Sequence, residues 1–215
     1  MTDALPGIGA VLIAYLLGSI PSAYIAGRLV LGSDVRKAGH GIAGGLNVFR
    51  QAGIAPAVAV SLADIGKGVA AVAIAHWAFG LPQVYVLLAG VAVVAGHLWM
   101  VFLKFSGGGA IGTGIGVVST VLPLYGYSPE LLFFLATVVV GLAITRNVAV
   151  GMMVGLLFLP LVLWLGTHSL QVTLFGLGVG VIIAAKRVRY LRAEISQAGN
   201  LKNYMFQSSF TRHKE

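Results

Sequence analysis

Cysteine is absent from this chain of 215 residues, and charged residues are scarce. The absence of cysteine excludes disulfide bonds, thiolate nucleophiles and cysteine-ligated metal sites. Charged residues make up 9% of the chain, whereas a soluble domain carries roughly 25%. Hydrophobic residues make up 58%. This composition excludes an ordinary soluble domain and indicates a protein that crosses a membrane several times.

Long apolar runs follow one another along the sequence. About seven of them approach the ~20 residues that a helix needs to cross the hydrocarbon core, although the fourth and fifth are short. The fourth begins among glycines, so part of it could be a half-helix. We expect an all-α polytopic membrane protein, with one transmembrane domain over 1–185 and a basic tail over 186–215. The expected spans are 8–30, 54–79, 84–103, 110–125, 131–145, 147–166 and 170–185.

Basic residues fall in alternate connections between these runs. The chain has 14 Lys and Arg and a net charge of +8. Apart from Lys67, they lie at or near the connections 31–53 and 104–109, at Arg146 and in the tail. By the positive-inside rule, we expect the N-terminus outside and the C-terminus in the cytoplasm. The charge does not indicate a nucleic-acid partner, because it covers no soluble face. The basic start of the tail would favour anionic lipid headgroups, and a simple stop-transfer signal explains it equally well.

The connection after the first run holds charges, glycines and an asparagine within a short stretch. Glycine lets the backbone approach a ligand, and Arg36 and Arg50 can bind phosphate oxygens through two parallel hydrogen bonds. A plain positive-inside loop would explain Arg36 but not the glycines around Asn47. We therefore favour a phosphate-binding role for this segment. Its candidate residues are Asp34, Arg36, Gly39, Gly41, Gly44, Asn47 and Arg50.

Asp64 and Lys67 are charged residues inside the second apolar run. Charges are costly within a membrane, so they pair with one another or line a polar cavity. Their spacing of three places both on one helix face, and we expect them to form an ion pair. The pair either only fixes helix packing or supports a functional site nearby.

The glycine run Gly107–Gly109 follows Lys104 and precedes a further apolar run. Glycine backbone at a helix N-terminus can offer N–H groups to an anion, with Lys104 nearby. A tight turn, or glycine used for close helix packing, is the alternative. The run matches the G-x-G-x-x-G pattern, but no βαβ unit surrounds it, so it does not indicate a dinucleotide site.

His97 lies near the cytoplasmic end of the third run. A histidine in this place can be a general base, a donor to phosphate or a hydrogen-bonded packing residue. The remaining histidines show no metal-type spacing, so we expect no metal site.

These features, in this order, resemble the bacterial PlsY family of membrane glycerol-3-phosphate acyltransferases, which use acyl phosphate as the donor. The resemblance is specific over roughly the first half of the chain and rests on topology over the second half. The matching residues are Gly18-Ser19-Ile20-Pro21, Asp34-Val35-Arg36, Gly39, Gly41, Gly44, Asn47-Val48-Phe49-Arg50, Asp64, Lys67-Gly68, Gly96-His97, Val101-Phe102-Leu103-Lys104-Phe105, Gly107-Gly108 and Thr113.

The resemblance implies acyl transfer from acyl phosphate to glycerol 3-phosphate at the cytoplasmic face of the bacterial inner membrane. The product would be lysophosphatidic acid, a phospholipid precursor, and no cofactor would be required. We assign catalytic roles to His97, Arg50 and Asn47. Substrate binding is assigned to Arg36, Gly39, Gly41, Gly44, Lys104, Gly107, Gly108, Gly109 and Thr113. Supporting roles are assigned to Asp34, Asp64, Lys67 and Arg146.

The chain also departs from the family pattern. Ser106-Gly107-Gly108-Gly109-Ala110 stands where the family has Lys-Gly-Gly-Lys-Gly, so two lysines are absent. Lys186-Arg187 and the residues after it supply neither the histidine nor the asparagine of the family's C-terminal motif. Two alternatives stay open: a relative without this activity that binds lipid or anions, and a small transporter. The hypothesis of a phosphate site predicts that Arg36, Asn47, Arg50, Lys104 and Gly107–Gly109 converge on one cytoplasmic cavity.

Overall fold

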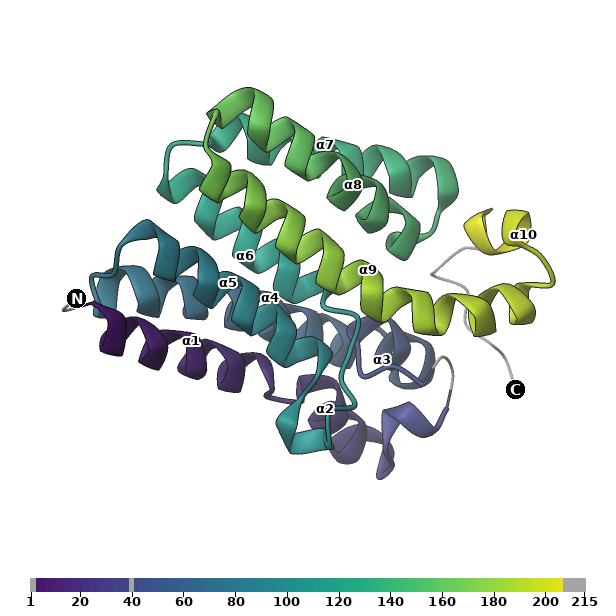
Figure 1. The fold of residues 1–215 in the computed structure, drawn as a ribbon. Coiled ribbons are helices and arrows are strands. Elements are labelled where there is room, and N and C mark those ends of the chain that lie inside the picture. Colours follow the sequence, from purple (N-terminus) through teal and green to yellow (C-terminus); the bar gives the residue numbers. More distant parts are fainter. Residues whose placement is uncertain (1–2, 39–40, 207–215) are drawn as a thin grey trace.

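The computed structural model describes residues 3–38 and 41–206, and these residues form helices joined by short connections (Figure 1). The shortest elements, η1, η2, η3 and α10, each comprise one or two helical turns. In chain order, the elements are α1 (Ala4–Gly18), α2 (Ser22–Leu31), η1 (Val35–Lys37), α3 (Gly45–Ala52), α4 (Ile54–Ala73), η2 (Ile74–Ala78), α5 (Gln83–Leu98), η3 (Val101–Leu103), α6 (Ile111–Leu124), α7 (Ser128–Thr145), α8 (Val148–Thr167), α9 (Leu170–Ala198) and α10 (Leu201–Phe206).

Every apolar run expected to span coincides with helical structure, which confirms the all-α membrane fold. The expected count of about seven spans stays a prediction. Among the described residues, 6 helical segments are long and apolar enough to cross a membrane, whereas α6 is shorter. With 14 residues, α6 is about 21 Å long, less than the ~30 Å hydrocarbon core. The reason is local: residues 106–110 are not helical, so the helix starts only at Ile111.

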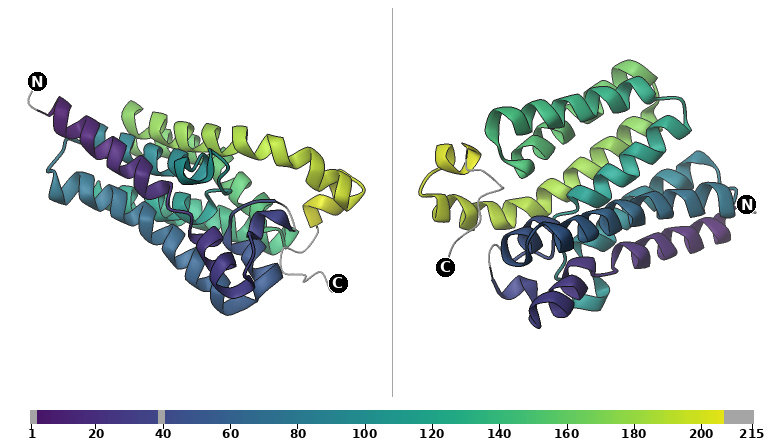
Figure 2. Two further views of the ribbon diagram at one scale, coloured as in Figure 1. Left: turned by 90° about the horizontal axis from the view of Figure 1, so that it is seen from below. Right: turned by 180° about the vertical axis from the view of Figure 1, so that it is seen from behind.

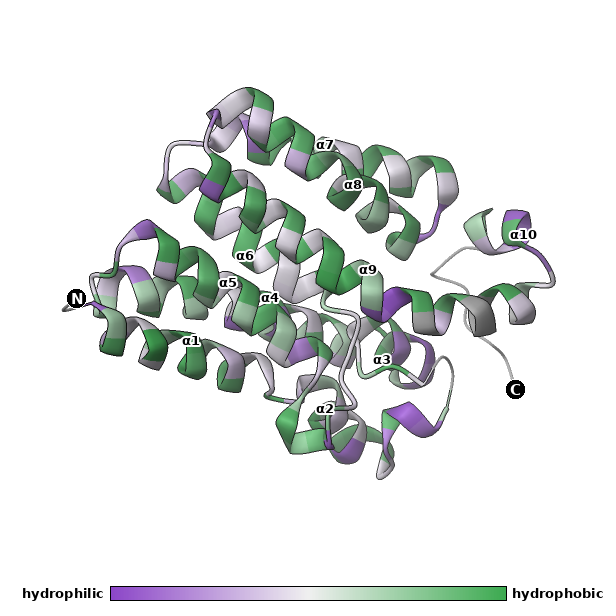
Figure 3. Ribbon diagram, in the orientation of Figure 1, coloured by the Kyte–Doolittle hydropathy of each residue, from purple (hydrophilic) through white to green (hydrophobic). Residues whose placement is uncertain are grey.

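The long helices lie side by side and run between two ends of the molecule (Figures 1 and 2). The main packing partners are α1 with α5, α4 with α6, and α7 with α8. Figure 3 shows hydrophobic residues along most of the helix lengths. Many of them face outward, as helices in a bilayer require, since lipid is as apolar as their side chains.

Glycines allow two of these helix pairs to approach closely. A methyl group on Gly18 of α1 would collide with the Val93 carbonyl of α5, and one on Gly96 would collide with the Tyr15 carbonyl. In the α4–α6 pair, a methyl group on Gly116 would collide with the Ile65 carbonyl. Small residues at such positions let backbones meet within a membrane. This packing fixes α4, α5 and α6 around the site described below.

The connections rich in basic residues lie at the end of the molecule that carries α3 and α10, opposite the N-terminal end of α1 (Figures 1 and 2). The direction of the molecule relative to the membrane stays a prediction. The division at residue 185 also stays a prediction, although α9 continues across it as one helix of 29 residues.

Candidate active site

A cavity of about 470 Å³ opens at this same end, among α3, α4, α5, α6, α8, α9 and α10. Part of its wall is apolar, with side chains such as Ile54, Val58, Ile115 and Val148. The lining also includes polar side chains, and two of them are arginines. The polar side chains that line it are Asn47, Arg50, Ser61, Asp64, His97, Asn147, Arg187 and Tyr204.

His97 lies in the last turn of α5 and is 2% exposed. Its Nδ1 is 3.2 Å from the Thr113 hydroxyl of α6 and 3.6 Å from an Asp64 carboxylate oxygen of α4. Among the described residues, the polar contacts of this ring are therefore at Nδ1. Such a contact orients an imidazole and leaves Nε2 for a substrate.

Asp64 is the centre of a buried polar group in α4. Its Oδ1 accepts a hydrogen bond from the Ser22 hydroxyl at 2.5 Å. The same oxygen forms an ion pair with Nζ of Lys67 at 2.8 Å. Lys67 also donates to the Ile20 carbonyl at 3.2 Å. The expected pairing of Asp64 with Lys67 is confirmed. Because both charges are buried, the pair needs these extra hydrogen bonds to offset the cost of desolvation.

Asn47 fastens the loop between α2 and α3. Its buried side-chain amide donates to the carbonyls of Val35 at 2.9 Å, Ile42 at 3.1 Å and Ala38 at 3.2 Å. Its own oxygen accepts from Gln51 at 3.1 Å. The amide group is thus committed to holding the loop, although the residue borders the cavity. A role in shaping the wall fits these contacts better than direct catalysis.

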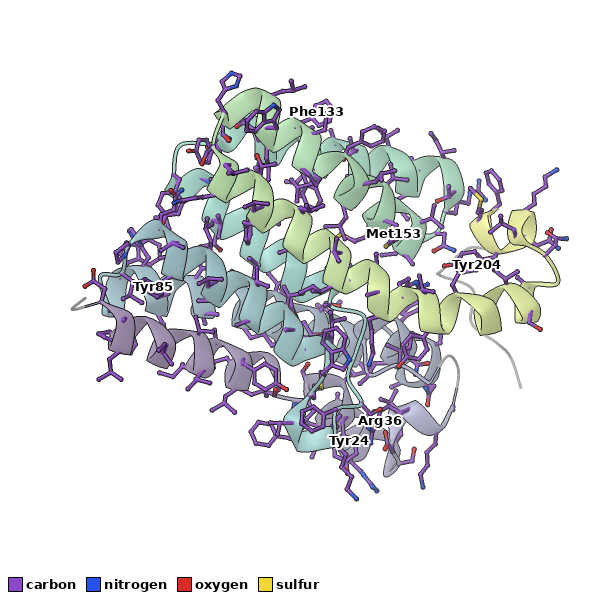
Figure 4. The ribbon with its side chains drawn as sticks, in the orientation of Figure 1. Tyr24, Arg36, Tyr85, Phe133, Met153 and Tyr204 are labelled. Carbon is purple, nitrogen blue, oxygen red and sulfur yellow. The ribbon has the colours of Figure 1, made fainter. Side chains whose placement is uncertain are left out.

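Asp34 and Arg36 form an ion pair at 2.7 Å in that loop, outside the cavity. The Arg36 guanidinium also lies over the Tyr24 ring at 5.5 Å (Figure 4) and donates to the Ser106 carbonyl at 3.3 Å. Hydrogen bonding from Arg36 lowers the pKa of the Asp34 carboxyl below its ordinary value. Arg36 therefore ties this loop to the start of the glycine run.

The glycine run packs against α5 rather than opening as a whole toward the cavity. The Gly108 N–H donates to the His97 carbonyl at 3.0 Å. Gly107 also lies close to the α5 backbone, because a methyl group on Gly107 would collide with the His97 carbonyl. Gly109 is the member that borders the cavity. Lys104 ends η3 in the left-handed region, with φ of 53°, and its side chain is exposed outside the cavity.

The assigned residues thus divide into three groups. Those that line the cavity are Gly44, Asn47, Arg50, Asp64, His97 and Gly109. Those that lie outside its lining are Asp34, Arg36, Gly41, Lys67, Lys104, Gly107, Gly108, Thr113 and Arg146. Gly39 falls outside the described residues. Of the group expected to converge, the cavity brings together Asn47, Arg50 and Gly109, while the roles assigned to all these residues stay predictions.

The cavity also includes side chains that the assignment from sequence does not contain. Asn147 directly follows Arg146, and its Oδ1 caps α8 by accepting from the Ala149 N–H at 3.1 Å. Arg187 belongs to the basic stretch of α9, where the sequence does not single out one arginine. Tyr204 of α10 carries no sequence signal and reaches the cavity only through the fold.

Metal ligands do not gather in the described part of the chain, where no group of three or more His, Asp or Glu residues could hold an ion. The cavity instead offers guanidinium groups, a histidine beside a carboxylate, and an apolar wall. This set suits a phosphorylated substrate with an apolar portion.

Residues 8–196 match the family model described as glycerol-3-phosphate acyltransferase, so the match ends before α10. Glycerol-3-phosphate acyltransferase 1 of Dehalococcoides mccartyi (strain ATCC BAA-2266 / KCTC 15142 / 195) is 39% identical over 90% of this chain and 93% of its own length. The glycerol-3-phosphate acyltransferase of Thermoanaerobacter sp. (strain X514) is 40% identical over 77% of this chain and 80% of its own length.

The fold is also similar to a solved membrane enzyme. The crystal structure of PlsY, an integral membrane glycerol 3-phosphate acyltransferase, in its glycerol 3-phosphate form has a TM-score of 0.79 and 28% identity. The match covers 89% of this chain and 93% of the PlsY chain. The lysophosphatidic acid form of the same protein has a TM-score of 0.75 and 26% identity.

Proposed function

This chain belongs to the glycerol-3-phosphate acyltransferase family, and on that premise we propose that it transfers a fatty acyl group from acyl phosphate to glycerol 3-phosphate. The hydroxyl oxygen of glycerol 3-phosphate attacks the acyl carbonyl carbon, and the bond between that carbon and the phosphate oxygen breaks. The products are lysophosphatidic acid and inorganic phosphate. The observation that carries this proposal is one cavity lined both by two arginines and by apolar side chains.

Arg50 and Arg187 reach this cavity from α3 and α9. Guanidinium groups bind phosphate oxygens through charge-assisted hydrogen bonds and neutralise charge on a departing phosphate. We assign them the phosphate groups of the two substrates. In this chain they take the place of the two lysines that the glycine run lacks.

His97 is assigned the proton of the attacking hydroxyl. Thr113 and Asp64 hold its Nδ1, so Nε2 is the nitrogen that receives this proton. Acyl phosphate is already an activated donor, and holding the hydroxyl beside its carbonyl carbon supplies much of the acceleration. No covalent intermediate on the enzyme is needed.

The apolar wall formed by residues such as Ile54, Val58 and Ile115 is assigned the start of the acyl chain. Ile54 and Val58 of α4 are 67% and 50% exposed. The acyl chain of the substrate can therefore extend from the cavity into the bilayer. The active end then faces the cytoplasm of a bacterial inner membrane, next to anionic headgroups, as the basic connections favour.

The test is acyl transfer by purified protein in lipid nanodiscs. Radiolabelled glycerol 3-phosphate is supplied with palmitoyl phosphate or with palmitoyl coenzyme A, and lysophosphatidic acid is measured. We expect product with palmitoyl phosphate. If only the coenzyme A ester gives product, the proposal that acyl phosphate is the donor is wrong. If neither donor gives product, the proposal that the protein is an enzyme is wrong, and a lipid- or anion-binding protein is favoured.

The same assay tests Arg50. We expect Arg50→Ala to lower kcat/KM on the order of 10- to 100-fold, because a charge-assisted hydrogen bond contributes about 1.5–3 kcal/mol. The matched control is Arg28→Ala, since Arg28 is an exposed arginine on α2 whose side chain contacts Tyr24 outside the cavity. Equal loss in both variants would show that Arg50 acts only through general charge.

A further inference from the structure

The helix α10 follows a sharp reversal of the chain at the end of α9. Gly199 ends α9 with φ of 82°, a left-handed conformation that favours glycine. The chain then turns back, and α10 packs against α9 and approaches α7. This helix lies beyond the part of the chain that matches the family model. The family model therefore carries no expectation for this helix.

Tyr204 is the residue of α10 that faces inward (Figure 4). It is 8% exposed, while Phe206 on the same helix is 52% exposed. The tyrosine lines the same cavity as Arg50 and His97. A large side chain from beyond the region that matches the family model thus forms part of the wall of the proposed active site.

Two hydrogen bonds hold Tyr204 against the cavity wall. The Arg187 guanidinium donates to its hydroxyl oxygen at 2.8 Å, and the Asn147 side-chain amide donates to its carbonyl at 2.9 Å. Asn147 is fixed in turn, because its oxygen caps α8. Tyr204 is therefore anchored to α8 through the backbone and makes its contact with Arg187 through the hydroxyl.

We propose that Tyr204 is a positioning residue that holds the Arg187 guanidinium in the orientation that binds the phosphate of glycerol 3-phosphate. An arginine side chain has many rotamers, and fixing it before the substrate arrives removes part of the entropic cost of binding. A tyrosine is suited to this task because it is rigid and its hydroxyl can accept from the guanidinium. The inference rests on the proposed function and deepens it at the acceptor site.

Tyr204→Phe is the sharpest substitution, because it removes the hydroxyl and keeps both the ring and the backbone contact with Asn147. We expect KM for glycerol 3-phosphate to rise about threefold to tenfold, with kcat and KM for palmitoyl phosphate within about twofold of wild type. A purely structural role would instead lower the amount of active protein, and so kcat, without a selective change in KM.

A double-mutant cycle with Arg187→Gln shows whether the hydroxyl acts through the guanidinium. Arg187→Gln alone is expected to raise the same KM at least as much. In that background, Tyr204→Phe is expected to have no further effect. Effects that simply multiply, or a Tyr204→Phe enzyme with unchanged KM, would overturn the proposal.

Phe206→Leu is the matched control, because Phe206 is an exposed aromatic residue on the same helix. It is expected to leave KM and kcat unchanged. Wild-type activity distinguishes the two levels of the argument. If the wild type makes no lysophosphatidic acid, the proposed function fails and the role of Tyr204 fails with it; if the wild type is active and Tyr204→Phe equals it, only the role of Tyr204 fails.

Discussion

Gly108 lies where two neighbouring groups leave no room for a side chain. A methyl group there would collide with the Ala43 carbonyl and with Nε2 of His97. Gly109, the next residue, has open space in the corresponding position. A side chain is therefore excluded at Gly108 but not at Gly109, and only the tertiary contacts reveal this difference.

Gly108→Ala is expected to lower the free energy of unfolding by about 1–3 kcal/mol, because backbone cannot move aside as easily as a flexible side chain. It should also lower activity, since the added methyl group displaces the His97 ring. Thermal unfolding in detergent and the acyl-transfer assay measure the two effects. Gly109→Ala is the control for unfolding and should melt close to wild type; equal melting of both variants would contradict this account.

At the scale of elements, side-chain hydrogen bonds hold the described parts of the loop between α2 and α3. Asn47 and Gln51 of α3 donate to its carbonyls. The Asp34–Arg36 ion pair joins it to Ser106, at the start of the glycine run. A hydrogen bond thus joins the loop and the glycine run into one connected unit beside α5.

The Asp34–Arg36 pair predicts how the stability of this unit depends on pH. Because Arg36 lowers the pKa of Asp34 from 3.8, the ion pair stabilises the folded protein above about pH 4, and this contribution is lost as pH falls through the lowered pKa. Asp34→Asn should therefore melt at a lower temperature than wild type at pH 5–8. The difference should shrink below about pH 4. A difference that stays constant down to pH 3 would contradict the prediction.

At the scale of the whole molecule, basic connections at one end and none at the other predict the direction of insertion. The absence of cysteine gives a background without reactive thiols. Lys37 and Ser128 are exposed and lie in connections expected on opposite sides of the membrane. Single cysteines at these positions can therefore report the two sides.

In intact spheroplasts, Ser128→Cys should react with a membrane-impermeant maleimide, whereas Lys37→Cys should react only after permeabilisation. Wild-type protein is the unlabelled control. The opposite pattern would reverse the predicted orientation and place the proposed active site outside the cytoplasm. Labelling of both cysteines in intact spheroplasts would indicate a mixed orientation.

The sequence by itself determined the features that depend on local pattern. Apolar runs defined the helices, because lipid demands long apolar stretches, and a spacing of three predicted the pairing of Asp64 with Lys67. The order of motifs also predicted the family. His97, Asn47 and Arg50 were selected because their residue types suit phosphate chemistry, and all three line the cavity.

Only the tertiary structure decided which polar residues share the cavity. Lys104 is near the glycine run in sequence, yet a left-handed turn leaves its side chain exposed. Arg187 and Tyr204 come from distant α9 and α10 and line the cavity with Arg50. Such convergence depends on how helices pack and where the chain reverses, and no local pattern encodes that geometry.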